Sequence, residues 1–332
     1  MTTRRDFLAE MGASTAAVRL AGIGSILTGS IAANAQSSRP ITMVVGFPPG
    51  GGPDLVARAL AERGRRELNQ PIVVENKTGA GGRIALDWLR NQAADGSAFC
   101  LTPAAMLASY PHVYKKLSYN PGDFDPVCKI CHYHVCVVTR SDAPFSTLKE
   151  FVAWAKATKK GTFGVPSRGS GTDFIGNLLS NAEGLGLEPV LYRGGPQLTQ
   201  AVLGGEVDLA INLSSNFIEL AKAGKVKILA VSTAARSSFS PSVPTLAELG
   251  YRDLVFEESI GIVAKKGTPE KAVLRMQEAM HKAMEDAIVR SALQTLEHRP
   301  DFRAAKQYGE DLAAASERYR TFVQKTNFQP LD

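Results

Sequence analysis

The sequence predicts an α/β protein with doubly wound sheets, in which open, mostly parallel sheets carry helices on both faces. Three observations support this fold class. Short apolar runs alternate with amphipathic helical patterns, glycine-rich turns join several strands to the following helices, and 332 residues suffice for two domains. Beyond Tyr251 the pattern changes to long helical stretches. We therefore expect the early part and the C-terminal helices to form one domain, with roughly 140–255 inserted as a second.

The first strand–turn–helix unit spans residues 41–58. The apolar run 41–45 predicts a buried strand, and the glycines 50–52 predict a turn. A helix is predicted next, with one face formed by Leu55, Val56, Ala59 and Leu60. A glycine-rich turn at this place leaves backbone N–H groups unpaired, and the helix dipole adds positive potential there. The turn is therefore suited to an anion, either a phosphate or a carboxylate.

Phosphate is the less favoured anion. A phosphate-binding P-loop needs Gly-Lys-Ser/Thr after the glycines, whereas Gly52-Pro53-Asp54 follows here, and the dinucleotide fingerprint does not fit either. Asp54 is the expected N-cap of the helix. The alternative interpretation is that the glycines only form a tight turn.

Two similar junctions follow. Residues 71–76 predict a strand that leads through the glycine-rich turn 77–82 into a helix over 84–90. Residues 98–101 predict a third strand, which ends at Thr102-Pro103. Ligands of open parallel sheets bind at the carboxyl ends of the strands, so these three junctions together predict a binding edge.

The central part repeats the alternation. Thr147 and Glu150 form a capping box for a helix, and further strands are expected over 162–165, 189–192, 207–212 and 226–231. Hydroxyl side chains of the loop 166–172 either cap the next helix or donate to a ligand. Arg193 either offsets the charge of an anion or is a solvated surface cation. The expected C-terminal elements are a short capped helix at 244–250, a strand at 259–264, a long helix from Pro269 to Ala287, and a last helix with a stripe at 312–323.

The cysteines allow three interpretations. The run 127–138, VCKICHYHVCVV, predicts one extended strand, whose side chains alternate between two faces. One strand cannot place Cys128, Cys131, Cys136 and the nearby histidines around one ion, so a metal is the least favoured interpretation. Core thiols are favoured, and a disulfide that includes Cys100 is the next alternative.

The N-terminus predicts export. Arg4-Arg5 lies in a twin-arginine motif, a weakly apolar segment follows, and Ala33-Asn34-Ala35 is a cleavage signal, so we expect a periplasmic protein cleaved after Ala35. The segment is too short and too polar to favour a membrane anchor. The basic residues are dispersed, so no nucleic-acid partner is expected.

Taken together, these segments resemble the substrate-binding proteins of tripartite tricarboxylate transporters, the Bug family of periplasmic receptors. The matching segments span the mature chain; they are 45–54 (VGFPPGGGPD), 74–82 (VENKTGAGG), 192–195 (YRGG), 203–208 (LGGEVD), 243–250 (VPTLAELG) and 267–269 (GTP). The resemblance implies a two-lobed, type II periplasmic binding protein of the Venus flytrap kind. It implies one lobe of residues 36–138 and 257–332 and another of 139–256, with hinge crossings near 137–141 and 254–260.

The resemblance also implies a ligand carboxylate held by backbone groups of the glycine loops. The ligand-binding residues expected on this basis, together with the strand end at Thr102, are Phe47, Gly50, Gly51, Asp54, Ala80, Gly82, Thr102, Ser167, Ser170, Thr172, Tyr192, Arg193 and Asn212. Three features depart from the family pattern: Pro53 replaces a common threonine, Asn212 replaces a common aspartate, and Glu257-Glu258 stands where an aromatic residue is usual. Without that aspartate we expect an aromatic or aliphatic carboxylate with no essential amino group.

The expected function is an extracytoplasmic receptor for a small carboxylate, which it delivers to membrane permease subunits or to a sensor. We expect a monomer without a cofactor, a metal or catalytic residues. The alternative is an exported hydrolase acting on a small acid. That alternative is less favoured, because the sequence has no GxSxG motif and the five histidines lie away from the glycine loops.

Overall fold

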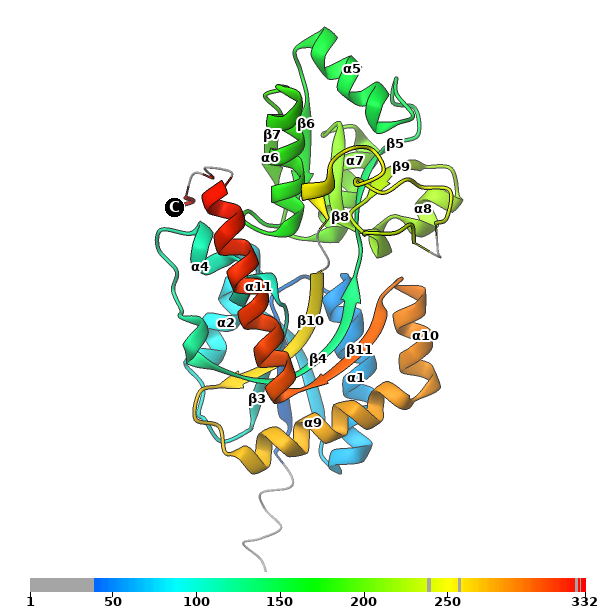
Figure 1. Cartoon of the computed structure of the whole chain (residues 1–332). Coiled ribbons are helices and arrows are strands. Elements are labelled where there is room, and N and C mark those ends of the chain that lie inside the picture. Colours follow the sequence, from blue (N-terminus) through cyan, green and yellow to red (C-terminus); the bar gives the residue numbers. More distant parts are fainter. Residues whose placement is uncertain (1–38, 238–239, 256–257, 326–327, 329) are drawn as a thin grey trace, which may run out of the picture. The chain divides into compact units, whose positions relative to one another are not determined.

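The computed structural model describes residues 39–237, 240–255, 258–325, 328 and 330–332. The predicted twin-arginine motif and cleavage site lie outside these residues. Two sheets with helices on their faces make up the described part of the chain, which confirms the predicted fold class (Figure 1).

The first sheet has six strands in the order β11-β4-β10-β3-β1-β2. Their bounds are β1 Ile41–Val45, β2 Ile72–Asn76, β3 Ala98–Pro103, β4 Phe124–Tyr133, β10 Glu258–Lys265 and β11 Arg299–Ala304. β1 pairs in parallel with both β2 and β3, whereas β10 is antiparallel to both β3 and β4. The carboxyl ends of β1, β2 and β3 therefore share one edge, as the sequence predicted.

Helices cover both faces of this sheet, because successive side chains of a strand point to opposite faces. Met43 and Val45 pack in one cluster with α1 and α9, while Val44, between them, packs in another with α2 and α11. The helices are α1 Gly52–Leu68, α2 Arg83–Arg90, α3 Ala105–Ala108, α4 Tyr110–Val113, α9 Glu270–Glu285, α10 Ala287–Thr295 and α11 Ala305–Lys325. The apolar stripes predicted for the C-terminal helices are thus core packing.

The second sheet has five strands in the order β7-β6-β8-β5-β9. Their bounds are β5 Val135–Arg140, β6 Thr162–Val165, β7 Glu188–Leu191, β8 Leu209–Leu213 and β9 Val226–Val231. β6 is parallel to β7 and β8, so these three strands share a carboxyl edge. The helices of this part are α5 Leu148–Thr158, α6 Gly171–Glu183, α7 Gly195–Gly204 and α8 Ile218–Lys222.

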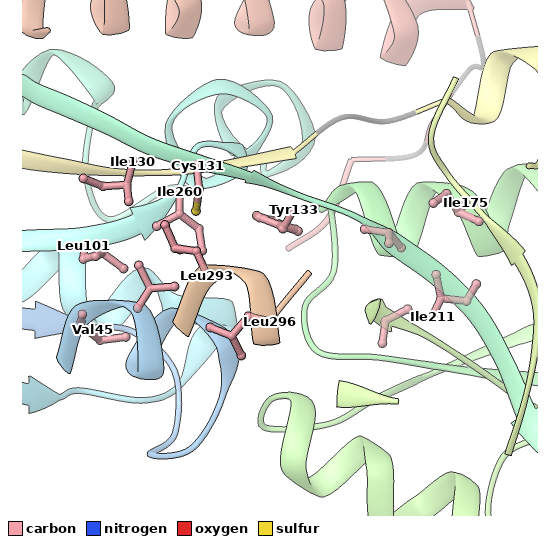
Figure 2. Packing of buried hydrophobic residues seen from close by; sticks show 14 of the residues in the cluster. Val45, Leu101, Ile130, Cys131, Tyr133, Ile175, Ile211, Ile260, Leu293 and Leu296 are labelled. Atoms are coloured by element: carbon pink, nitrogen blue, oxygen red, sulfur yellow. The ribbon is translucent and has the colours of Figure 1, made fainter. Parts of the chain in front are cut away.

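The cysteine-rich run is not the single strand that was expected. It divides into β4 and β5, which belong to different sheets, and His134 between them accepts a hydrogen bond from the backbone of Ser214 through its carbonyl. Figure 2 shows Ile130, Cys131 and Tyr133 on this segment, with Ile260 beside the first part and Ile211 toward the second. All four cysteines are buried free thiols, which confirms the core interpretation. Burial raises the pKa of each thiol.

The predicted helix at 244–250 is wrong, and the backbone hydrogen bonds give the reason. Val231 of β9 donates to the carbonyl of Pro244 and accepts from the N–H of Leu246, so this stretch is held at a strand edge. Thr245 and Glu248 still form the reciprocal capping bonds, but only turns follow them. The helix predicted from Pro269 to Ala287 ends earlier, at Glu285.

Asp286 then caps a separate helix, α10, which the sequence analysis did not predict. The edge strand β11 was also missed, because its polar residues and Pro300 give no strand pattern. Within the described residues, the search for a helix long and apolar enough to span a bilayer finds none.

Candidate functional site

A pocket lies where the strand ends and helix starts of the two sheets meet. Its walls come from the β1–α1 loop, the end of β3 with α3 and α4, the β6–α6 loop, the start of α7 and the end of β8. Its cavity volume is about 50 Å³. A buried water needs about 10–15 Å³, so the pocket has room for a few water-sized groups.

Three of the longer helices, α1, α6 and α7, begin at this pocket. Gly51 and Gly52 at α1, Ser170 and Gly171 at α6, and Gly195 at α7 all line it. None of the three N-caps makes a side-chain capping hydrogen bond. The first N–H groups of a helix have no partner within the helix, and the helix dipole makes this end positive. The arrangement therefore favours an anion.

Asn212 adds a side-chain donor at the end of β8. It lines the pocket, only 1% of the residue is exposed, and its Nδ2 amide has no hydrogen-bond partner among the described residues. An amide left unpaired in a buried place costs free energy, so an arriving acceptor gains a favourable hydrogen bond there. A carboxylate oxygen is such an acceptor.

The remaining wall is largely apolar. Phe47, Pro103, Met106, Tyr133 and Leu213 line it. Such a wall suits the hydrocarbon part of a ligand and lowers the effective dielectric constant around its charged end, so that hydrogen bonds to that end strengthen.

Asp54, expected at the ligand, instead braces the first glycine loop from inside. It is 1% exposed and does not line the pocket. Its carboxylate accepts from the backbone N–H of Gly50 at 2.9 Å, from Arg58 at 3.0 Å and from Asn76 at 2.8 Å. Burial raises the pKa of Asp54, but the hydrogen bonds from Arg58, Gly50 and Asn76 together hold it below its ordinary value.

In the β6–α6 loop, Asp173 plays the same part as Asp54, and the sequence did not predict this. Asp173, fully buried, accepts from the backbone N–H of Gly169 at 2.9 Å and from Asn177 at 3.0 Å, and it pairs with Arg168. Burial raises the pKa of Asp173, and these partners offset only part of that effect. Ser167, Ser170 and Thr172 of this loop line the pocket.

The second glycine loop lies behind the pocket wall. Tyr110, which lines the pocket, donates its hydroxyl hydrogen to the carbonyl of Gly81 at 3.0 Å. Of the residues expected at the ligand, Ala80 and Gly82 belong to this loop and do not line the pocket. Thr102 is also outside the lining, and its hydroxyl donates to the carbonyl of Pro103.

Two other expected residues lie near the start of α7 without lining the pocket. Tyr192 is buried, with its hydroxyl 3.3 Å from a carboxylate oxygen of Glu206, and Arg193 is exposed. The structure thus brings Phe47, Gly51, Ser167, Ser170, Thr172 and Asn212 together at the pocket. It leaves Gly50, Asp54, Ala80, Gly82, Thr102, Tyr192 and Arg193 outside the lining.

Sequence reasoning missed several wall residues. Tyr110, Tyr133 and Asn216 carry no motif that could have identified them. For Glu258 there was one indication in the sequence, because an aromatic residue is usual in the family at Glu257-Glu258. It is 4% exposed, and its Oε1 accepts from the hydroxyl of Tyr319 at 2.5 Å. Burial raises the pKa of Glu258, against the opposing hydrogen bonds from Tyr319 and from the backbone of Gly171.

Comparisons with known proteins identify the same receptor family that the sequence segments resemble. The model of the tripartite tricarboxylate transporter family receptor matches residues 56–328. A relative from Cupriavidus necator, described as the UPF0065 protein in the gbd 5' region, is 31% identical over 326 residues, which cover 97% of this chain and 97% of the relative.

Two solved protein structures are similar to this chain over most of its length. The periplasmic binding protein BugD is similar with a TM-score of 0.84 and 27% identity, covering 88% of this chain and 99% of that one. MatC from Rhodopseudomonas palustris, solved with bound malate, is similar with a TM-score of 0.81 and 27% identity, covering 86% and 99%. The chain therefore belongs to the tripartite tricarboxylate transporter receptor family, and it is a two-lobed periplasmic solute receptor rather than an enzyme.

Proposed function

We propose that this receptor binds a small carboxylate at the pocket where α1, α6 and α7 begin. The solute's carboxylate accepts from backbone N–H groups in the first turns of α1 and α7 and from the amide of Asn212. The observation that carries the proposal is that amide, a buried donor without a partner among the described residues, beside uncapped helix starts. Each charge-assisted hydrogen bond contributes about 1.5–3 kcal/mol.

Two further points support a carboxylate. The apolar wall suits the hydrocarbon body of an organic acid. MatC, which shares the fold over most of its length, was solved with malate, a small carboxylic acid. Asn212 is uncharged, so nothing at that position attracts an ammonium group, and the preferred solute is an aromatic or aliphatic acid without an essential amino group.

The proposal includes how the receptor works. Residues 36–138 with 257–332 form one lobe, 139–256 form the other, and the lobes close over the solute about hinges near 137–141 and 254–260. The division of the strands into two sheets supports this scheme, since β4 and β5 belong to different sheets. The chain is exported by the twin-arginine route, is cleaved after Ala35, acts as a monomer and delivers its solute to a permease or a sensor.

Calorimetric titration of the mature chain tests the ligand class. The panel holds malate, benzoate, hexanoate and a set of amino acids. We expect at least one simple carboxylate to bind, without product formation, and to stabilise the fold by about 2.7 kcal/mol at 100 times its dissociation constant. Tight binding of amino acids without any binding of simple carboxylates would refute the proposed ligand class.

Asn212→Ala tests the site. This variant should bind the acid at least about tenfold more weakly, because a charge-assisted hydrogen bond is lost. The unfolding temperature of the free protein should change little, since the Nδ2 amide has no described partner to lose. Asn91→Ala, an exposed asparagine on α2's C-terminal side, is the matched control and should bind normally. Normal binding by Asn212→Ala would remove this residue from the site.

A further inference from the structure

Glu258 places a carboxyl group on the wall of the pocket. Of the described residues that line the pocket, it is the one with an acidic side chain. It is the first residue of β10, where it lies opposite Tyr133 of β4. A carboxylate is an unexpected wall residue for a receptor whose ligand is itself an anion, because like charges repel.

The geometry shows what this carboxylate does. A methyl group added at Gly171, the first residue of α6, would lie 2.5 Å from Oε1 of Glu258. The backbone of Gly171 hydrogen-bonds the carboxylate, and the Tyr319 hydroxyl donates to its Oε1. Both partners are donors, so they hold Glu258 as an acceptor.

Glu258 therefore occupies the positive end of α6 in place of an N-cap side chain. Ser170, at the N-cap position, makes no capping bond, and its hydroxyl is engaged by Ser167 and Thr172. The first turns of α1 and α7 have no comparable acidic side chain among the described lining residues. The start of α6 thus differs from those of α1 and α7, because the carboxyl group of Glu258 already occupies it.

We infer that Glu258 makes the receptor selective for monocarboxylic acids, because the protein's own carboxylate takes the place of a second ligand carboxylate at the α6 end of the pocket. The inference rests on the proposed function. The solute's single carboxylate lies at α1, α7 and Asn212, and its other end is uncharged. A hydroxyl or amide hydrogen at that end finds an acceptor in Glu258, whereas a second carboxylate meets a like charge.

The test compares acids of equal carbon number. Dissociation constants of the mature chain are measured at pH 8 for hexanoate against adipate, butyrate against succinate and benzoate against phthalate. Wild type should bind the monoacid of any recognised pair at least about tenfold more tightly than the diacid. In Glu258→Gln, which keeps the shape and an acceptor oxygen but removes the charge, the ratio within that pair should fall at least about tenfold.

Glu62→Gln, on the exposed face of α1, is the control for a charge change and should keep the wild-type ratio. Unfolding temperatures establish that each variant is folded. If Glu258→Gln does not fold, Tyr319→Phe is used instead; it keeps the carboxylate and should keep the preference for the monoacid.

The possible outcomes distinguish failure of the inference about Glu258 from failure of the proposed function. If acids bind but the diacid is equal or better in wild type, or if Glu258→Gln leaves the ratio unchanged, the inference is overturned and the proposed function stands. If no acid of the panel binds either protein, the proposed function fails and the inference fails with it.

Discussion

The loops before α1 and α6 follow one plan in the two sheets, yet they meet the pocket differently. In each loop an aspartate at the third helical position, Asp54 or Asp173, accepts from the backbone N–H four residues earlier, that of Gly50 or Gly169. Each aspartate also has an arginine and an asparagine as partners, which are Arg58 and Asn76 for the first and Arg168 and Asn177 for the second.

The difference lies in what each brace supports. No acidic side chain among the described lining residues lies at the first turn of α1, whereas the first turn of α6 meets Glu258. The two aspartates also differ, since the pKa of Asp54 is lowered and that of Asp173 is raised. An acidic residue in a glycine loop is therefore no sign of ligand contact by itself, because here its acceptor groups serve the loop.

The largest expected effect comes from the glycines of the two loops. Gly50 and Gly169 have φ angles of 78° and 72°, which alanine adopts at a cost of about 1–2 kcal/mol. A methyl group at Gly50 meets nothing within 4 Å, but one at Gly169 would overlap the side chain of Val113. Gly169→Ala should therefore lose about 1–3 kcal/mol more unfolding free energy than Gly50→Ala.

Urea denaturation of both variants measures these losses. Equal losses would show that the Val113 contact gives way easily, and the two loops would then be alike in packing as well as in hydrogen bonding.

The next effect is the removal of each aspartate charge. At pH 7, Asp54→Asn should lower the unfolding free energy by about 2–3 kcal/mol, because charge-assisted hydrogen bonds to the loop and to Arg58 are lost. Asp173→Asn should cost less, because burial disfavours the ionised form of Asp173 and the neutral amide avoids that desolvation. Denaturation curves at pH 7 compare the two, and a larger loss for Asp173→Asn would reverse the comparison.

The same variants should respond oppositely to acid. A lowered pKa means that Asp54 stabilises the fold above its unfolded value near 3.8, and that this contribution is lost as the pH falls through the folded pKa. A raised pKa means that the contribution of Asp173 is complete below 3.8 and is lost as the pH rises through its folded pKa.

Wild type should therefore lose its advantage over Asp54→Asn on acidification below about pH 4 and should gain stability relative to Asp173→Asn. Unfolding free energies measured from pH 3 to pH 7 test this, and parallel pH curves for the two variants would contradict the assignment.

The smallest effect concerns the loop before α7. Arg193 is exposed and outside the pocket lining, so Arg193→Ala should change the unfolding free energy by less than about 0.5 kcal/mol and the affinity for a bound acid by less than about twofold. Calorimetry of this variant beside Asn212→Ala gives the contrast. A tenfold loss of affinity in Arg193→Ala would instead show that Arg193 contributes to ligand binding.

Local patterns in the sequence were enough for most elements of the fold. β1, β6 and β9 have the predicted bounds, because short apolar runs between turn residues leave little choice of structure. The glycine loops at strand ends pointed to the sheet edges at which the pocket lies, and Phe47, Gly51, Ser167, Ser170, Thr172 and Asn212 line it. Periodicity and turn chemistry act over a few residues, so one chain is sufficient to reveal them.

Only the tertiary structure decided which polar groups of those loops face the pocket. Asp54 and Asn212 are both polar residues beside a strand end, but Asp54 has its acceptors filled by Gly50, Arg58 and Asn76, while the amide of Asn212 has no described partner. Glu258 reaches the start of α6 from a strand 87 positions later in the chain, a proximity that no local pattern encodes. Hydrogen-bond partners distant in sequence decide whether a polar group braces a loop or remains available to a ligand, and folding alone brings those partners together.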